Sequence, residues 1–392
     1  MTRLRWTHGR RYTFLGPIVA ATALVAAACG NSEQISVSSP SQEDSRNQAD
    51  ADPSPAGPIA TQIDPPARVD GAGVIVSAQA TVPTENAKAS EGFRQPHNLL
   101  LRDISRDSAQ TIDVNTASKY ITPISGTANE STVTILLRLC PEVGYGSFLQ
   151  CIDEKYGVLQ VDRKPGATGA EVRELPKLGS GYQAVAFDGT TIRAVGTSLI
   201  GAMESLNSGD PAPKATTELV ASTDGGEFVA VNSRETTNLK PCFTEDGSLW
   251  DLDPQSKGLL RLAPTKESSW TPYADMKVEP GASFACGGSN VAVLNALDGS
   301  GFMFSISNPS KIVPLEKPSF ETDPFTAASI SVEFDSVDQL PYVVGSGTVY
   351  GWDSNGARTA EAVAAQVTGL PRASGRFWIS RSTDEPKTEE VR

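Results

Sequence analysis

Between residues 70 and 380, apolar and polar positions alternate over short runs, and this period of two predicts β-strands. The clearest runs are Thr132–Leu139, Gln183–Phe187, Phe228–Val231, Val291–Leu294, Gly301–Ile306 and Tyr342–Val344. No stretch of this region keeps a helical apolar period for long, and Ala360–Val367 is the best short candidate for a helix. The pattern therefore predicts an all-β domain over residues 70–380.

Turn-forming pairs separate the predicted strands. They are Asp188-Gly189, Asp224-Gly225-Gly226, Asp246-Gly247, Gly287-Gly288, Asp298-Gly299 and Asn355-Gly356. Asp-Gly and Asn-Gly between alternating runs are typical of β-hairpins, because these residues tolerate the positive φ angles of tight turns. We expect a succession of antiparallel hairpins.

A weak internal repeat follows three of the cysteines. The segments Cys151–Asp162, Cys242–Asp253 and Cys286–Asn295 align as strand end, turn and strand, and Val344–Asp353 aligns as a copy without a cysteine. The cysteines are 91 and then 44 residues apart, which fits two periods and one. A repeat of about 45 residues with several strands is typical of a β-propeller blade. The domain has room for six or seven blades, and we prefer seven.

The hairpin Asp246–Asp253 resembles the blade hairpin of quinoprotein-like and related bacterial propellers, and this resemblance implies the same fold. Two stacked β-sandwiches are the alternative, since they also consist of short alternating strands. Ring closure offers a check. Val74–Ser77 and Arg376–Ile379 are predicted strands at opposite ends of the domain, and in many propellers the terminal strands share one blade, which removes the open edge.

The first 28 residues have the three parts of an export signal. Met1–Arg11 is basic, Phe14–Ala28 is apolar, and small residues precede Cys29. The apolar stretch is about 15 residues long, whereas a membrane-spanning helix needs about 20. The segment Ala26-Ala27-Ala28-Cys29 resembles the bacterial lipobox, which implies cleavage before Cys29 and attachment of lipid to its thiol.

The export route is left open between two alternatives. Arg10-Arg11-Tyr12-Thr13-Phe14-Leu15 resembles a twin-arginine signal but has one residue more than usual between the arginines and the Phe-Leu pair. General secretion is therefore the preferred route. Either route leaves a chain held by lipid on the extracytoplasmic face of a cell membrane.

Composition divides the rest of the chain. Residues 29–69 are rich in Ser, Pro, Asp, Gln and Ala and have hardly any aromatic residue, which predicts a disordered linker behind the lipidated cysteine. Residues 381–392 are strongly charged and are predicted to be a flexible tail. The expected order is signal peptide 1–28, linker 29–69, β-propeller 70–380 and tail 381–392.

The net charge limits the possible partners. The whole chain has a formal charge of −13. Residues 1–28 hold four arginines and no acid, so their removal leaves 29 basic and 46 acidic residues, a charge of −17. Such a chain repels nucleic acid and anionic headgroups. We expect no nucleic acid partner and contact with the membrane through the lipid anchor alone.

Four cysteines follow Cys29, and none belongs to a Cys-x-x-Cys pair, which argues against zinc and thioredoxin-like chemistry. An even number of cysteines in an exported domain predicts disulfides. Cys140 and Cys151 bracket a turn-rich stretch between two strands, and Cys242 and Cys286 fall at equivalent points of predicted neighbouring blades. Of the three possible pairings, we predict Cys140–Cys151 and Cys242–Cys286.

Candidate catalytic and cofactor-binding residues are sparse. His8 lies in the predicted signal peptide and would be removed with it. His97 could act in a Ser-His-Asp triad, but the sequence contains no Gly-x-Ser-x-Gly motif for the nucleophile. We therefore interpret His97 as structural or solvated. Asp246, Asp251 and Asp253 are a weak candidate for calcium, although their spacing differs from the helix-loop-helix calcium pattern. No glycine-rich phosphate loop precedes a helix. We predict no catalytic residue, no metal site and no cofactor.

The predicted function is a protein-binding or scaffold module in the bacterial cell envelope, accessory to a membrane complex. Aromatic residues on exposed turns often dominate interfaces, and the candidates are Tyr145, Trp270, Tyr273 and Trp352. For Trp352, packing between blades is an equal alternative. A competing hypothesis is a propeller enzyme, namely a lactonase, glycosidase or quinone-dependent dehydrogenase. A solute-binding lipoprotein is disfavoured because the strand–helix alternation of two-lobed α/β proteins is missing.

Overall fold

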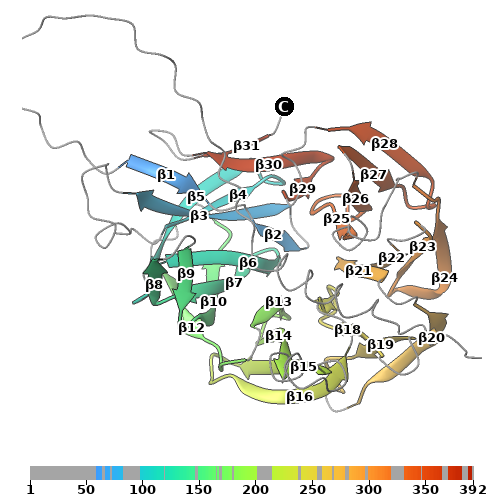
Figure 1. The fold of residues 1–392 in the computed structure, drawn as a ribbon, viewed down its shortest axis with the longest axis horizontal. Helices are drawn as coiled ribbons and strands as arrows, with labels where there is room; N and C mark the ends of the chain where they lie inside the picture. The colour runs from blue at the N-terminus through green and yellow to red at the C-terminus, as the bar shows by residue number, and fades with distance from the viewer. Residues whose placement is uncertain are drawn as a thin grey trace, which may run out of the picture.

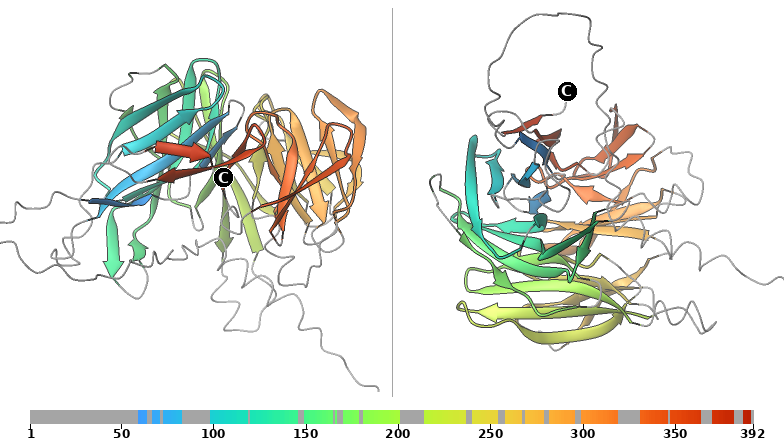
Figure 2. Two further views of the ribbon diagram at one scale, coloured as in Figure 1. Left: turned by 90° about the horizontal axis from the view of Figure 1, so that it is seen from above. Right: turned by 60° about the vertical axis from the view of Figure 1, so that its left-hand side comes forward.

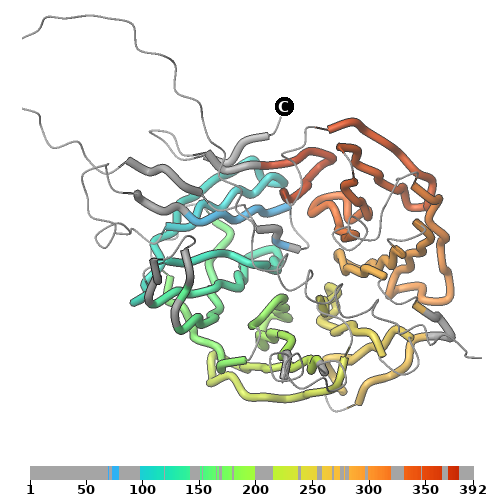
Figure 3. Tube along the Cα trace, in the orientation of Figure 1, coloured from blue at the N-terminus to red at the C-terminus, as the bar shows by residue number. Residues whose placement is uncertain are grey.

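The computed structural model, traced in Figure 3, describes part of the chain. The described residues are 59–63, 67–70, 73–82, 98–118, 120–145, 149–164, 166, 170–178, 181–200, 214–236, 240–253, 258–266, 269–278, 282–295, 299–318, 331–345, 347–363, 370–381 and 387–390. Every regular element within them is a β-strand, as the alternating pattern predicted. The described residues form no helix with the length and apolar character that crossing a membrane requires.

Four antiparallel sheets have four strands each and follow one another along the chain. The first consists of β13 (Tyr182–Phe187), β14 (Thr191–Ile200), β15 (Lys214–Thr223) and β16 (Val229–Thr236). The second consists of β17 (Cys242–Phe243), β18 (Leu249–Leu252), β19 (Gly258–Leu262) and β20 (Thr271–Lys277). The third consists of β21 (Ala282–Gly287), β22 (Asn290–Asn295), β23 (Gly301–Ser305) and β24 (Asn308–Leu315). The fourth consists of β25 (Glu333–Phe334), β26 (Pro341–Gly345), β27 (Thr348–Trp352) and β28 (Arg358–Ala362).

A ten-stranded sheet precedes these four. It contains two antiparallel groups of strands, which a parallel pair between β2 and β6 joins at Val69–Gly126 and Asp70–Thr127. The first group is β2 (Ala67–Asp70), β3 (Val74–Val82), β4 (Asn98–Asp103) and β5 (Ser108–Asn115), with β1 (Ile59–Ile63) on β3 and β11 (Ala170–Glu171) on β5. The second group is β6 (Tyr120–Ala128), β7 (Thr132–Cys140), β10 (Lys155–Asp162) and β12 (Arg173–Glu174).

Two smaller sheets complete the described strands. They are the ribbon of β8 (Glu142–Tyr145) and β9 (Leu149–Ile152), and a three-stranded sheet of β29 (Arg372–Ala373), β30 (Arg376–Arg381) and β31 (Lys387–Glu390).

The sheets stand around a central axis, and β13, β21 and β25, the first strands of three of the four-stranded sheets, lie on the inside (Figures 1 and 2). This arrangement is a β-propeller, and it excludes the alternative of two stacked sandwiches. The blade count of six or seven stays a prediction, because the β2–β6 pair merges two groups of strands into one sheet.

The core lies between neighbouring sheets rather than in one central layer. Trp250 and Leu259 of one sheet pack against Phe284 and Val293 of the next, for example. A strand between two sheets is covered on both faces and needs no polar side. Accordingly Val291–Leu294 of β22 is no more than 3% exposed at any position, whereas most of the outermost strand β24 is exposed.

A buried ion pair joins the two halves of the ten-stranded sheet. Asp103 ends β4, and Arg163 follows β10. Their side chains are 1% and 7% exposed, and Arg163 Nε donates to Asp103 Oδ2 over 2.8 Å. Arg163 also donates to the Asn129 carbonyl and to Ser105 Oγ. This network ties together the turns of two neighbouring groups of strands.

Three boundaries differ from those predicted. Strands begin at β1 (Ile59–Ile63), within the predicted linker, and β31 (Lys387–Glu390) lies in the predicted tail. Composition missed both because they are short, and each gains order by pairing with a longer strand, β3 or β30. Ala360–Ala362, at the start of the candidate helix, belongs to β28.

Ring closure differs from the shared blade that the sequence suggested. The predicted strands Val74–Ser77 and Arg376–Ile379 belong to β3 and β30, which lie in separate sheets. These sheets are nonetheless neighbours in Figure 1. The Gly73 N–H donates to the Ser336 carbonyl over 3.0 Å, which links the first group of strands to the turn after β25.

The structure confirms both predicted cysteine pairs. Cys140 and Cys151 connect β7 to the ribbon, with Cα atoms 5.4 Å apart. Cys242 and Cys286 connect β17 to β21, the first strands of two neighbouring sheets, with Cα atoms 5.7 Å apart. The reason given for the second pair, equivalent positions of neighbouring blades, is also correct.

Candidate protein-binding surface

The predicted contact residues occupy different surroundings. Trp352 lies in β27, is 2% exposed, and its Nε1 donates to the Glu316 carbonyl over 2.8 Å. It packs between two sheets, so the proposal that it contacts a partner is wrong and the alternative of packing between blades holds. Tyr145 lies on β8, but its side chain falls outside what the structure describes.

Trp270 directly precedes β20, Tyr273 lies near its start, and the two side chains contact different neighbours. Trp270 is half-buried, its Nε1 donates to Asn232 Oδ1 over 2.8 Å, and the Arg234 guanidinium lies 5.0 Å from its ring centre. Asn232 and Arg234 both belong to β16. Trp270 therefore covers one face of β16 and remains partly accessible.

Tyr273 packs toward the following sheet. Its ring stacks on Phe304 at 4.5 Å and meets the edge of Trp250 at 4.9 Å, and its hydroxyl donates to the Pro309 carbonyl over 2.9 Å. Burial raises the pKa of this phenol. These contacts hold Tyr273 as a bridge between two sheets, so Trp270 is the better placed of the two for a partner.

Strand β16 carries an exposed apolar end that the sequence did not single out. Val229 is 58% exposed, and the only other large hydrophobic residue of the described chain with high exposure is Ile312, at 43%. The neighbouring Phe228 is half-buried, and Ala230 is exposed. The run Phe228–Val231 was predicted as a strand. An alternating run cannot distinguish a covered strand from the last strand of a sheet.

A groove of about 610 Å³ adjoins this end of β16. The β12 side contributes Arg173, Glu174, Leu175 and Pro176, and the turn before β16 contributes Gly225, Gly226, Glu227 and Phe228. The groove thus lies between two neighbouring groups of strands. Its walls combine apolar surface with charged side chains.

Arg173 is held in place at this groove. Its guanidinium lies 4.8 Å from the centre of the Phe228 ring and donates to Ser222 Oγ and the Gly226 carbonyl. A cation over an aromatic face stabilises both groups. The turn itself needs positive φ at Asp224 and Gly225, which have angles of 50° and 77°. The predicted Asp224-Gly225-Gly226 turn therefore sets one wall of the groove.

The exposed charges beside Val229 are acidic. Asp224 and Glu227 are both exposed in the turn that leads into β16. The two nearby arginines are already engaged, Arg173 with Phe228 and Arg234 with Trp270 and with Asp253 at 3.6 Å. A ligand at this surface therefore meets apolar groups flanked by carboxylates.

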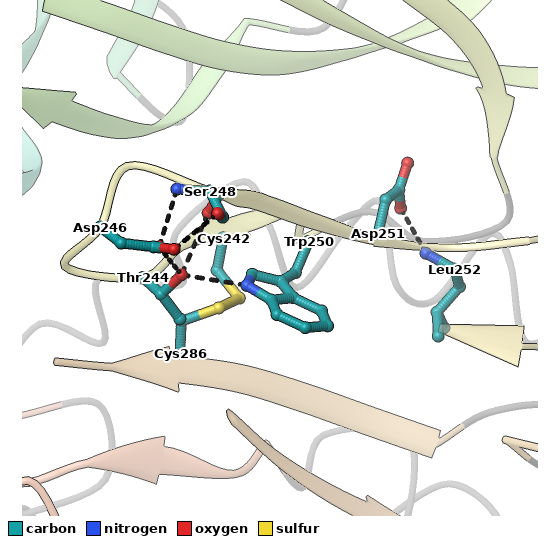
Figure 4. The surroundings of a disulfide bond; sticks show 8 residues. All are labelled: Cys242, Thr244, Asp246, Ser248, Trp250, Asp251, Leu252 and Cys286. Carbon is teal, nitrogen blue, oxygen red and sulfur yellow. Dashed lines mark hydrogen bonds between the residues drawn. A yellow bond between two sulfur atoms is a disulfide. The ribbon is translucent and has the colours of Figure 1, made fainter. Parts of the chain in front are cut away.

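The three aspartates of the candidate calcium site do not converge. Asp246 accepts hydrogen bonds from Thr244 Oγ1, from Ser248 and from Arg261, and Asp251 accepts from Thr217 and Thr236. Asp253 faces Arg234. Figure 4 shows the side chains of Asp246 and Asp251 well apart in space, with Trp250 between them.

The Asp246 hairpin has a structural explanation. Burial alone would raise the pKa of Asp246. Hydrogen bonds from Thr244 and Ser248 and the charge of Arg261 lower the pKa by more, so the net shift is downward. Thr244 Oγ1 also accepts from Trp250 Nε1 over 3.0 Å (Figure 4). The polar side chains of the hairpin Asp246–Asp253 and of Thr244 thus stabilise the turn of this hairpin through hydrogen bonds.

Other predicted sites lie outside the described residues, namely Cys29 and His97. Among the residues that the structure describes, no group of three or more His, Cys, Asp or Glu side chains is arranged to hold a metal ion.

Comparison with known proteins adds structural neighbours of low similarity. No family model matches the chain, and no curated protein matches its sequence. A virginiamycin B lyase from Staphylococcus aureus is 11% identical with a TM-score of 0.45, over 80% of this chain and 90% of the lyase. A streptogramin B lyase is 10% identical with a TM-score of 0.45, over 86% and 95% of the two chains. Citrobacter koseri AztD is 10% identical with a TM-score of 0.36, over 77% and 86%. Similarity at this level gives no information about activity or partners.

Proposed function

We propose that this chain is a lipid-anchored extracytoplasmic protein whose propeller binds a protein partner in the bacterial cell envelope. The anchor part of the proposal rests on the lipobox-like segment before Cys29. With two or more acyl chains, such an anchor is stable. The linker then lets the propeller stand away from the bilayer.

The observation that carries the binding part is the exposed apolar end of β16. A 58% exposed valine beside a groove lined by Phe228 and Pro176 is surface that a partner can cover. Farther along β16, Arg234 lies against the ring of Trp270. Tryptophan and arginine are residue types that carry much of the binding energy at interfaces.

We name the strand edge Phe228–Val231, together with Arg173–Pro176 on one face of its sheet and Trp270 on the other, the β16 surface. The acidic residues Asp224 and Glu227 beside it favour a basic partner, and the charge of −17 calculated for the chain after Cys29 has the same effect at longer range. A membrane-complex protein with a basic extracytoplasmic segment meets this description.

Chemical crosslinking in intact cells tests the proposal. The full chain, tagged at its C-terminus, is compared with Val229→Lys and with the matched control Ile312→Lys on β24. We expect a crosslinked envelope protein with the wild type and the control, and its loss with Val229→Lys. Equal capture by all three, or no protein partner together with turnover of a lactone, glycoside or alcohol by the purified propeller, would contradict the proposal.

A further inference from the structure

The outer strands of the four-stranded sheets differ in how their edges are protected. An edge strand exposes backbone groups that can pair with another chain, and proteins often block this with proline, lysine or other charges. Strand β20 contains Pro272, β24 contains Pro309, Lys311 and Pro314, and β28 contains Arg358 and Glu361. Each of these strands is a poor template for pairing.

Strand β16 has no such protection along its first half. Its sequence from Val229 is Val-Ala-Val-Asn-Ser, without a proline or a charge. It is the last strand of its sheet, and no described strand pairs with it on the side away from β15 (Figure 1). In an antiparallel ladder every second residue directs its N–H and C=O away from the neighbouring strand. The pairing of β16 with β15 follows this pattern except at Val231, where the register shifts between Ala230 and Asn232. The edge therefore offers hydrogen-bonding groups beside exposed apolar side chains.

From this contrast we infer that the β16 surface binds an extended, basic segment of its partner as an added β-strand, an inference that rests on the proposed function. The segment pairs with the edge at Val229–Ser233, and its end enters the groove between Phe228 and Pro176. Backbone hydrogen bonds supply affinity in such strand addition, and side-chain contacts supply specificity.

The chemistry of the occupant follows from the surface. The exposed Val229 favours an apolar side chain at the position that pairs with it, because neighbouring strands align residues on the same face. Asp224 and Glu227 favour lysine or arginine where the segment passes the turn. A segment with alternating valine and lysine satisfies both requirements.

Hydrogen–deuterium exchange of the purified propeller with synthetic ten-residue peptides tests this inference. The probe alternates valine and lysine. One control peptide has glutamate in place of lysine, and a second has proline at two central positions. We expect the probe to slow exchange in β16 but not in β24. We also expect the acidic peptide to bind at least about tenfold more weakly, and the proline peptide to give no protection.

Variants of the protein sharpen the test. Val229→Lys and Glu227→Lys should each lower the affinity for the probe peptide about tenfold, whereas Ile312→Lys should leave this affinity unchanged. All three residues are on the surface, and an unchanged melting temperature verifies the fold. If the proline peptide protects β16 as well as the probe does, or if the probe protects nothing at millimolar concentration, strand addition is wrong. The proposed function still stands in that case if crosslinking in cells depends on Val229, and fails as well if it does not.

Discussion

Removal of the two disulfides should destabilise the propeller by unequal amounts. The variants are Cys242→Ala with Cys286→Ala, and Cys140→Ala with Cys151→Ala. The bonds close loops of 44 and 11 residues. In the chain-entropy treatment these loops correspond to about 4 and about 3 kcal/mol, a difference of about 1.2 kcal/mol that comes from loop length alone.

Burial adds a similar cost to both variants. Cys286 is 1% exposed and packs in the core cluster with Trp250 and Phe284, and Cys140 is 3% exposed. An alanine at either position leaves a small void, which adds roughly 1 kcal/mol. The Cys242–Cys286 bond joins the first strands of two sheets, whereas Cys140–Cys151 fastens the β8–β9 ribbon to β7. We expect losses of about 5 and about 4 kcal/mol.

Guanidinium unfolding followed by tryptophan fluorescence measures both losses, because Trp250 lies beside the Cys242–Cys286 bond (Figure 4). Linear extrapolation gives the free energy of unfolding, and the m-value reports any change in the denatured state. The wild type treated with reductant is the control for effects of alanine itself. Equal losses, or a larger loss for Cys140 and Cys151, would refute the reasoning.

Two further outcomes follow from the structure, and a third follows from the sequence before Cys29. Arg163→Ala should lower the free energy of unfolding by about 3 kcal/mol, because it removes the buried guanidinium that donates to the Asp103 carboxylate and leaves Arg106, at 3.8 Å and more exposed, as the charged partner. Lys177→Ala, which breaks an exposed ion pair with Asp153, should leave the free energy of unfolding almost unchanged. Similar losses for these two variants in denaturant unfolding would contradict this. The pKa of Asp246 is lowered in the folded state, so its contribution to stability is present above its unfolded pKa of about 4 and is lost as pH falls. Asp246→Asn should therefore have a lower free energy of unfolding than the wild type at pH 7, and this difference should become smaller below pH 4. A difference that stays constant between pH 7 and pH 3 would show that the Asp246 charge does not stabilise the fold. Cys29→Ala should move the protein out of the membrane fraction of cells, and full retention there would exclude the lipid anchor.

The hairpins were predictable because their signals are local. The pair Asp188-Gly189 joins β13 to β14, since Asp188 Oδ1 accepts the N–H groups of Thr190 and Thr191 and Gly189 adopts a φ of 104°. Such a turn depends on a few consecutive residues and is therefore visible in the sequence.

The position of a hairpin within a sheet was harder to predict. The copies at Cys242 and Cys286 are the first and second strands of neighbouring sheets, as expected. The copy at Cys151 instead combines the ribbon strand β9 with β10, and the copy at Val344 combines β26 with β27. Every hairpin of a sheet has the same alternation and the same glycine-containing turn, so the repeat alone could not fix its place.

The candidate binding surface was also beyond local sequence analysis. The four aromatic candidates were chosen by residue type, and Trp352 proved to be buried by a neighbouring sheet. Val229 belongs to a run that resembles the covered run Val291–Leu294, and only its place on the outermost strand leaves it exposed. The groove beside it forms between β12 and the turn before β16, which lie about 50 residues apart in the sequence.

Site-specific photo-crosslinking in intact cells tests the central claim most directly. A photoreactive amino acid is placed at position 229, and in a separate strain at position 312, the other exposed large hydrophobic position. Both variants keep Cys29 and are compared at equal expression. The account predicts that position 229 yields one discrete adduct with an envelope protein, mapped by mass spectrometry to a basic extended segment, and that position 312 yields none. The same adducts from both positions, or none from position 229, would contradict a partner-binding role for this surface.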